Sequence, residues 1–289
     1  MYKRQLLEKW GPDRIVDTPI AEAAIAGLGI GAALTGSRPI AEFMYSDFMG
    51  IAMDQIVNQA AKNRYMFGGK ASLPLTYRAS FGAGTGNAAQ HTQSLEAWFA
   101  HVPGLKVITA STPYDAKGLL KSAIREDNVV VMFEHKAIYA MRGHVPEEEY
   151  LVPIGVADVK REGSDVSVIT YARQVHNALE AAEQLSTEGV SVEVVDIRSL
   201  YPLDTEAILR SVRKTHRAVV LYEAVRFGGF GAEIASQIQE LAFDDLDAPV
   251  LRVGAAHAPV PFSEPLEQGS FPDAESVATA IRDSLQGAR

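Results

Sequence analysis

The chain has 289 residues, of which 47% are hydrophobic and 22% charged, with a formal net charge of −9 and no cysteine. This length predicts two domains, each able to bury a core, and the composition is that of an ordinary globular protein. The negative charge disfavours nucleic acid or an anionic membrane as the main partner. The lack of cysteine excludes disulfides, thiolate nucleophiles and cysteine-bound metals, and no apolar stretch is long enough for a membrane span. We therefore expect a soluble, cytoplasmic protein.

The first five residues, MYKRQ, match the translation of a common sequencing-adapter tail. Segments of this kind are set aside before a fold is inferred. We therefore expect Leu6 to be the first natural residue of an N-terminally truncated chain.

The first element along the chain is a helix whose start is indicated by Thr18 and Pro19. A hydroxyl residue followed by proline is typical of a helix cap and first turn. Residues 23–33 are apolar nearly all round, which predicts a buried helix. Glu22 enters this apolar run and has two interpretations. It is either a surface acid that favours the helix dipole or a carboxylate in a low-dielectric site that exchanges a proton with a bound molecule.

The rest of the first half alternates strands and helices. Strands are predicted at 38–44, 73–78, 105–109 and 128–134, and helices at 49–65, from about 90 to 99 and at 113–125. Such alternation is the mark of a parallel sheet covered on both faces.

The periodicity fails between residues 136 and 153, where the sequence is acidic and rich in turn residues. We place the linker there, which divides the chain into domains at 1–145 and 146–289. In the second half, strands are predicted at 165–171, 190–197, 218–223 and 249–253, and helices at 175–186, 204–215, 230–242 and 273–285. The predicted fold class is α/β, with two open parallel-sheet domains.

Several residues are candidates for chemistry, each with a structural alternative. Gly27, Gly29, Gly31 and Gly36 loosely match a dinucleotide fingerprint, but they fall within the predicted helix, which favours close helix packing instead. The loop from Gly82 to Gly86 suits either a close backbone approach to a ligand or a plain surface loop. His91 follows that loop at a predicted helix start and is either structural or cleft-facing. Phe48 is either a core residue or a stacking platform for a flat ring.

A series of segments, taken together, resembles one family. In order and spacing, the segments DTPIAE, RPIAEFM, DQIVNQAAKNRYMFGGKAS, AAQHTQ, HVPGLKV, PYDAKGLLKSAIRE, VVDIRSLYPLD and GGFGAEIA are similar to the β subunit of the thiamine-diphosphate-dependent component of 2-oxo acid dehydrogenase complexes. The resemblance covers the chain from about Leu6 to its end. It implies a pyrimidine-binding α/β domain followed by a transketolase C-terminal domain.

The resemblance also implies roles for single residues. Glu22 would meet the aminopyrimidine ring of thiamine diphosphate and exchange a proton with it, Phe48 would pack on that ring, and His91 would face the substrate and the lipoyl arm. The family holds a structural potassium ion at positions that match Leu75, Ala123, Ile124, Glu126 and Asn128. Aspartate is usual in the family where this chain has Glu126.

The motif that holds the diphosphate in thiamine enzymes is missing. Such enzymes bind the diphosphate through magnesium on a GDG motif, and no GDG occurs in this sequence. In the split family that half belongs to the α subunit. The resemblance therefore implies an α2β2 heterotetramer, which passes its acyl group to the lipoyl domain and core of a dihydrolipoyl acyltransferase.

The substrate and the reaction class have alternatives. The segments RYMFGGKAS, PYDAKGLL, EHK and PVPFSEPLE, together with an apolar Ile51, look most like the acetoin-cleaving branch. Pyruvate or branched-chain 2-oxo acids are the alternatives within the family. A transketolase-like enzyme is a rival within the enzyme class, and an α/β scaffold that docks an acyltransferase core is a rival outside it.

Overall fold

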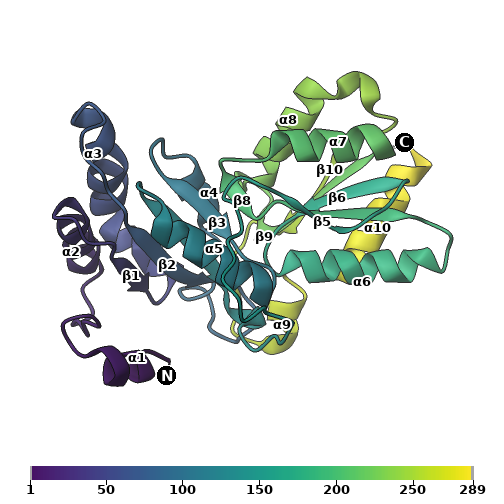
Figure 1. The fold of residues 1–289 in the computed structure, drawn as a ribbon. Coiled ribbons are helices and arrows are strands. Elements are labelled where there is room, and N and C mark those ends of the chain that lie inside the picture. The colour runs from purple at the N-terminus through teal and green to yellow at the C-terminus, as the bar shows by residue number, and fades with distance from the viewer. Residues whose placement is uncertain (1, 288–289) are drawn as a thin grey trace.

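The computed structural model describes residues 2–287 of the chain and shows two α/β domains side by side (Figure 1). Met1 of the suspected tail, and the last two residues of the predicted second domain, lie outside the described residues. No helix in the described part is long and apolar enough to cross a membrane.

The first sheet, as described in residues 2–287, has the strand order β1-β2-β4-β3-β8. Its strands are β1 (Ile40–Phe43), β2 (Thr76–Phe81), β3 (Lys106–Thr109), β4 (Val130–His135) and β8 (Ser199–Tyr201). The strands β1 to β4 pair in parallel, whereas β8 pairs antiparallel to β3. The helical elements are α1 (Tyr2–Trp10), α2 (Glu22–Leu34), η1 (Ser46–Ala52), η2 (Asp54–Ala60), α3 (Ala61–Met66), α4 (Glu96–Ala100), α5 (Pro113–Arg125) and η3 (Lys136–Ile138).

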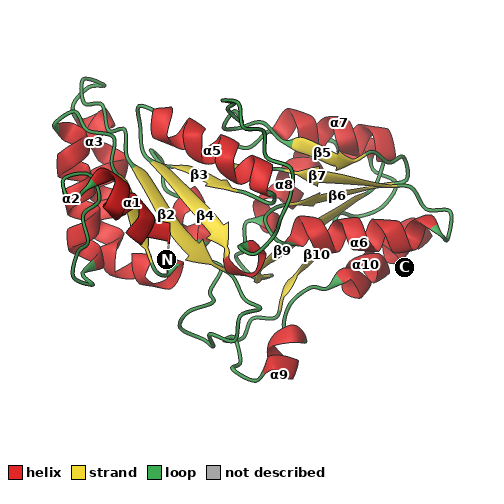
Figure 2. Ribbon diagram, turned by 60° about the horizontal axis from the view of Figure 1, so that its bottom comes forward, coloured by secondary structure: helices red, strands yellow, loops and turns green. Residues whose placement is uncertain are grey.

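The second sheet has the order β10-β9-β6-β7-β5 within the same described range. Its strands are β5 (Asp158–Arg161), β6 (Val166–Thr170), β7 (Val192–Asp196), β9 (Ala218–Val225) and β10 (Leu251–Ala255). Here too one edge strand, β5, runs antiparallel to its neighbour. The helical elements are α6 (Gln174–Ser186), α7 (Thr205–Thr215), α8 (Gly231–Leu241), η4 (Phe243–Asp245), α9 (Glu264–Gln268) and α10 (Ala274–Gln286). Figure 2 shows α6 and α10 together on one side of this sheet and α7 on the other.

The central strands are apolar on both faces because both faces are covered. In β4, Val130 and Met132 pack with residues of α5, while Val131 and Phe133 join the large core on the opposite face. That large core continues into the second domain, where it includes residues of β6, β9, α7 and α8. One hydrophobic core therefore crosses the seam between the two domains.

The predicted fold class is confirmed, with one refinement. Both sheets are parallel in their interior, but each ends on a short antiparallel strand that the alternation of strands and helices did not predict. The strand β8 comes from the second half of the sequence and completes the sheet of the first half. An ion pair also joins the two domains. Lys160 on β5 and Asp115 on α5 lie 2.7 Å apart, nitrogen to oxygen.

The predicted start and burial of the first helix are wrong. The helix α2 begins at Glu22 with Ala21 as its cap. Pro19 disfavours helical geometry at Thr18, and the chain turns at Ile20 before the helix starts. Only one face of α2 is buried, and Leu28 on the other face is 64% exposed. The predicted helix at 49–65 is instead three consecutive helical segments. They are the 3₁₀ helix η1, the π-helix η2 and the short α-helix α3.

Candidate active site

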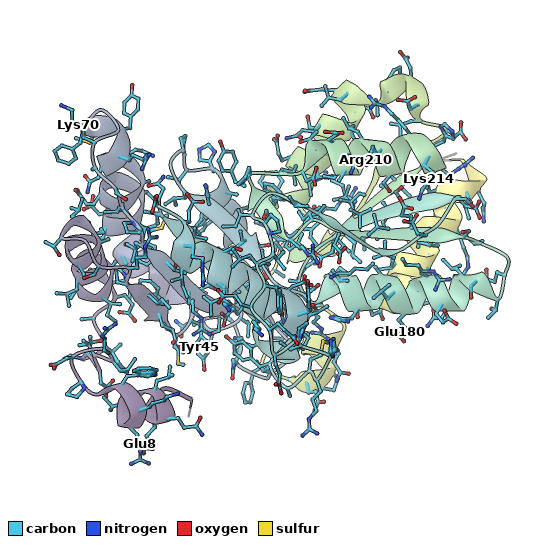
Figure 3. All side chains as sticks on the ribbon, in the orientation of Figure 1. Glu8, Tyr45, Lys70, Glu180, Arg210 and Lys214 are labelled. Carbon is cyan, nitrogen blue, oxygen red and sulfur yellow. The ribbon has the colours of Figure 1, made fainter. Side chains whose placement is uncertain are left out.

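The candidate site lies at the edge of the first sheet where β1, β2 and β4 end. Tyr45 follows β1, Gly82 follows β2 and Lys136 follows β4 directly. The helix α2 runs into β1 from the opposite direction, so its first residue, Glu22, lies at the same edge. Figure 3 labels Tyr45 on the lower rim of the first domain, where these ends meet. The carboxyl ends of parallel strands are where α/β folds build their ligand sites.

Glu22 combines burial with an absence of partners. The residue is 8% exposed, and among the described residues no hydrogen bond or ion pair reaches its carboxylate. Its carboxylate oxygens are not among the buried atoms that lack a partner, so they keep access to the surface at the start of α2. The backbone N–H groups and the helix dipole at this end of α2 favour a negative charge there. Glu22 therefore stands at the start of the helix, and its proton exchange with a bound molecule stays a prediction.

The structure brings Phe48 and His91 into contact. Their ring centroids are 5.2 Å apart at an interplanar angle of 75°, and Tyr45 meets the same imidazole edge-on at 5.6 Å. Phe48 and Tyr45 belong to the segment around η1, which packs against α2. The three predicted site residues Glu22, Phe48 and His91 thus come from elements at one edge of the sheet.

His91 lies in an irregular loop, and its predicted place at a helix start is wrong because α4 begins only at Glu96. Side chains hold the loop instead of helical hydrogen bonds. The Asp47 carboxylate accepts from the backbone N–H of Gln93 at 3.1 Å and from its side-chain amide at 2.9 Å. The ammonium of Lys136 donates to the carbonyl oxygen of His91.

The glycine loop before His91 is held by the second domain. The Glu267 carboxylate accepts from the backbone N–H of Gly84 at 2.9 Å and from that of Gly86 at 3.1 Å. Glu223 accepts from the backbone N–H of Ala83 at 2.7 Å. Gly82 has φ +87°, and a Cβ there would overlap the ring of His135. The loop is therefore neither a free ligand cradle nor a plain surface loop, because its amides already bind carboxylates.

Buried charges surround this loop. His135 and Glu223 lie 2.7 Å apart, nitrogen to oxygen, in a fully buried pair. Burial opposes the ionisation of Glu223, but His135 and the Ala83 N–H outweigh it and hold the pKa of that carboxyl below its usual range. Nearby, burial raises the pKa of Glu96 to about 7, although the hydroxyl of Tyr171 donates to it at 2.7 Å.

The residues proposed for potassium lie at the opposite edge of the sheet. Ala123 and Ile124 lie in the last turn of α5, and Glu126 caps that helix. Asn128 precedes β4, and Leu75 precedes β2.

The Arg38 guanidinium donates to two of the carbonyl oxygens at that edge, those of Ile124 and Glu126, both at 3.1 Å. The Glu126 carboxylate pairs with Lys106 at 2.6 Å. The Asn128 side chain donates to the Gly104 carbonyl at 3.2 Å, while its Oδ1 is buried with no partner among the described residues.

Sequence reasoning missed Lys136, Glu223 and Glu267 as members of the site. The available signal was positional, because Lys136 and Glu223 stand at or near the carboxyl ends of apolar strands, where charged residues are unusual in a core. No local signal could have linked Glu267 to the glycine loop, since 183 positions separate it from Gly84.

Comparison with known families first defines the class of protein. The transketolase pyrimidine-binding domain matches residues 2–141, and the transketolase C-terminal domain matches residues 155–277. Among solved structures, a chain described as a split-gene transketolase, inactive beta4 tetramer, superposes with a TM-score of 0.81 at 26% identity, covering 100% of this chain and 89% of that one.

Curated relatives narrow the class. The acetoin:2,6-dichlorophenolindophenol oxidoreductase subunit beta of Cupriavidus necator is 50% identical over 96% of this chain and 82% of its own length. The Bacillus subtilis protein of the same name is 48% identical over 97% and 82%, and the 2-oxoisovalerate dehydrogenase subunit beta of that organism is 47% identical over 96% and 86%. The chain belongs to this family of acetoin and 2-oxo acid dehydrogenase β subunits.

Proposed function

We propose that this chain is the β subunit of a thiamine-diphosphate-dependent acetoin dehydrogenase component. The observation that carries the proposal is Glu22, whose carboxylate lies at a helix start, keeps accessible oxygens and has no protein partner among the described residues. Its helix packs against the segment that carries Phe48. A flat aminopyrimidine ring fits this corner, because it offers a nitrogen to the carboxylate and a face to the phenyl ring. The supporting relatives are named as acetoin oxidoreductase β subunits.

Thiamine diphosphate supplies, when bound, a carbon nucleophile that adds to the substrate carbonyl and carries the acyl group. The chain's own residues have narrower tasks. Glu22 holds and exchanges a proton with the ring nitrogen, and Phe48 fixes the plane of the ring. His91 faces the substrate side, where it orients the carbonyl oxygen and the arriving lipoyl group.

The diphosphate and its magnesium are proposed to be held by an α subunit. Within residues 2–287, no group of three or more histidine, aspartate or glutamate side chains is arranged to hold a metal ion. The amides of the glycine loop are already bound to Glu223 and Glu267. The relatives named subunit beta support a partner chain of this kind.

The face that would meet the α subunit is proposed to include the uncovered side of α2 and the segment from η1 to α3. Large apolar side chains gather there, namely Leu28, Ile51, Tyr65, Met66 and Phe67, all more than half exposed. Exposed apolar patches of this kind mark interfaces. We infer an α2β2 heterotetramer in the cytoplasm, which passes its product to the lipoyl domain and core of a dihydrolipoyl acyltransferase.

A structural potassium ion is proposed at the end of α5. The buried, unpartnered Oδ1 of Asn128 and the carbonyl oxygens that end the helix are ligands of the type this ion takes, although Arg38 shares two of them. Thermal unfolding in 100 mM potassium, compared with sodium, tests this. A higher midpoint in potassium supports the site, and identical midpoints contradict it.

Acetoin is proposed over 2-oxo acids because Ile51, three residues beyond Phe48 and 61% exposed, offers no group to bind a substrate carboxylate. The test is co-expression with the α subunit encoded beside this chain, followed by reduction of an artificial electron acceptor with acetoin, pyruvate or 2-oxoisovalerate. Turnover of acetoin alone is the expected result. Turnover of a 2-oxo acid instead would correct the substrate, and a stable complex that turns over none of the three would favour a non-catalytic scaffold.

A further inference from the structure

Lys136 is a buried lysine in contact with the candidate site. It is only 8% exposed, although lysine is among the residues least often buried. Its ammonium donates to the carbonyl oxygen of His91 and lies 4.4 Å from the ring centroid of Tyr45, over the ring. One cation therefore contacts both the backbone of His91 and an aromatic ring that packs against the His91 imidazole.

Carboxylates from both domains offset the cost of burying this charge. Burial lowers the pKa of Lys136, and Asp47 of the first domain, with Glu223 and Glu267 of the second, opposes that shift. Glu223 and Glu267 are the same groups that hold the glycine loop. The lysine is thus part of a network that spans the seam and ends at His91.

Thr92, the next residue, donates its hydroxyl to the Ala88 carbonyl, but among the described residues Lys136 is the group that bonds to the His91 carbonyl itself. The loop has no regular structure at this residue. Asp47 fixes Gln93, and Phe48 supports the imidazole edge, but neither reaches the His91 backbone. We infer that Lys136 is a positioning residue, which holds the His91 peptide so that the imidazole faces the substrate. This inference rests on the proposed function, since it assumes that His91 acts in the reaction.

The experiment uses the reconstituted complex with its α subunit and compares Lys136→Met, His91→Ala and the double variant. Lys136→Met keeps the length of the side chain and removes its charge and its donor. We expect kcat to fall about 30-fold, within the range that a small misplacement of a catalytic group costs, with KM for the substrate nearly unchanged. Because Lys136 acts through His91, the double variant should be no slower than His91→Ala alone.

Lys117 provides a matched control. It also donates to backbone carbonyls of a loop, including that of Glu148 at 3.1 Å, and lies 4.9 Å from the ring centroid of Tyr150, but none of these contacts involves His91. Lys117→Met should leave kcat unchanged. Lys136→Arg keeps the buried charge, and so the fold, but moves the donor. We expect this variant to lose about 10-fold in kcat, again with no further loss when His91→Ala is added.

Two results would overturn the inference. One is an unchanged kcat in both Lys136 variants. The other is a double variant whose loss in kcat equals the product of the two single losses, which is the result expected of an independent structural defect. A His91→Ala complex that is as fast as wild type would instead contradict the role that the proposed function gives to His91. The two failures are therefore distinguishable.

Discussion

The two corners of the candidate site are built in opposite ways. At the Glu22 corner, a carboxylate with accessible oxygens has no partner among the described residues, and Leu28 on α2 and Ile51 on η1 are exposed. At the His91 corner, Lys136 and Glu223 have partners and link the two domains, although one oxygen of Asp47 is buried without a partner among the described residues.

This difference indicates which part of the site is formed within this chain and which part needs a second molecule. An accessible carboxylate without a protein partner is free to bind another molecule, and an exposed apolar patch is unusual on a monomer unless it meets one. At the His91 corner, most of the charged groups are already bound within this chain. We therefore expect substitutions at the Glu22 corner to affect activity and assembly, and substitutions around the His91 corner to affect stability as well.

The largest expected effect is that of Glu22→Gln on the reconstituted complex. Glutamine keeps the shape but cannot exchange a proton, so kcat should fall by about 1,000-fold or more, in the range of general acid–base catalysis. The urea midpoint should be unchanged. Glu180→Gln, on the exposed surface of α6 (Figure 3), is the control and should be fully active. A Glu22→Gln complex as fast as wild type would refute the central role of this residue.

Glu223→Ala should have the largest effect on stability. It leaves His135 without its partner and frees the Ala83 N–H, both buried. Leaving a buried hydrogen-bonding group without its partner costs about 1–3 kcal/mol, which urea unfolding of the chain can measure. For comparison, Glu206→Ala removes an exposed ion pair with Arg210 and should cost less than about 1 kcal/mol. Equal losses in the two variants would show that the His91 corner is not held by its buried charges.

Glu96 should make stability depend on pH. Its pKa is raised from 4.5 to about 7 by burial, so the folded state binds this proton more tightly than the unfolded state. The resulting stability is present below pH 4.5 and is lost as pH rises through about 7. Glu96→Gln does not titrate, so relative to wild type it should gain on the order of 3 kcal/mol between pH 4.5 and pH 8. Unfolding at several pH values measures this, and a constant difference would contradict it.

The smallest effect on the fold is expected from Leu28→Ser. Because Leu28 is largely exposed on α2, the stability of the isolated chain should change by less than about 0.5 kcal/mol. Binding to the α subunit, measured by titration, should weaken about 10-fold because the residue lies on the proposed interface. Leu241→Ser, at an exposed leucine that ends α8, should leave binding unchanged. Equal affinities for both variants would show that the α subunit binds to another face of this chain.

Sequence reasoning succeeded where local chemistry decides. The helix α5 begins and ends as predicted, because Thr112 caps it through a hydrogen bond from Asp115 N and Pro113 fills the first position. The interior strands were predicted because burial on both faces makes them continuously apolar. Glu22 was singled out for the same kind of reason, as a charge within an apolar run.

Sequence reasoning failed where distant segments decide. The strand β8 is only Ser199–Tyr201 and exists because it pairs with β3. The His91 loop lacks helical structure because Asp47 and Lys136 compete successfully for its backbone groups. The start of α2 was misplaced because proline is as compatible with an extended segment as with a first helical turn.

The strand β8 also bears on how molecules reach the site. It locks a piece of the second half of the chain into the sheet of the first, and the shared core and the Lys160–Asp115 pair reinforce it. Many two-domain enzymes admit substrate by bending at the linker between domains. Here such bending would have to separate β8 from β3. We therefore expect the two domains to move as one rigid unit. We expect the proposed α subunit, and not bending between these domains, to control entry to the Glu22 corner.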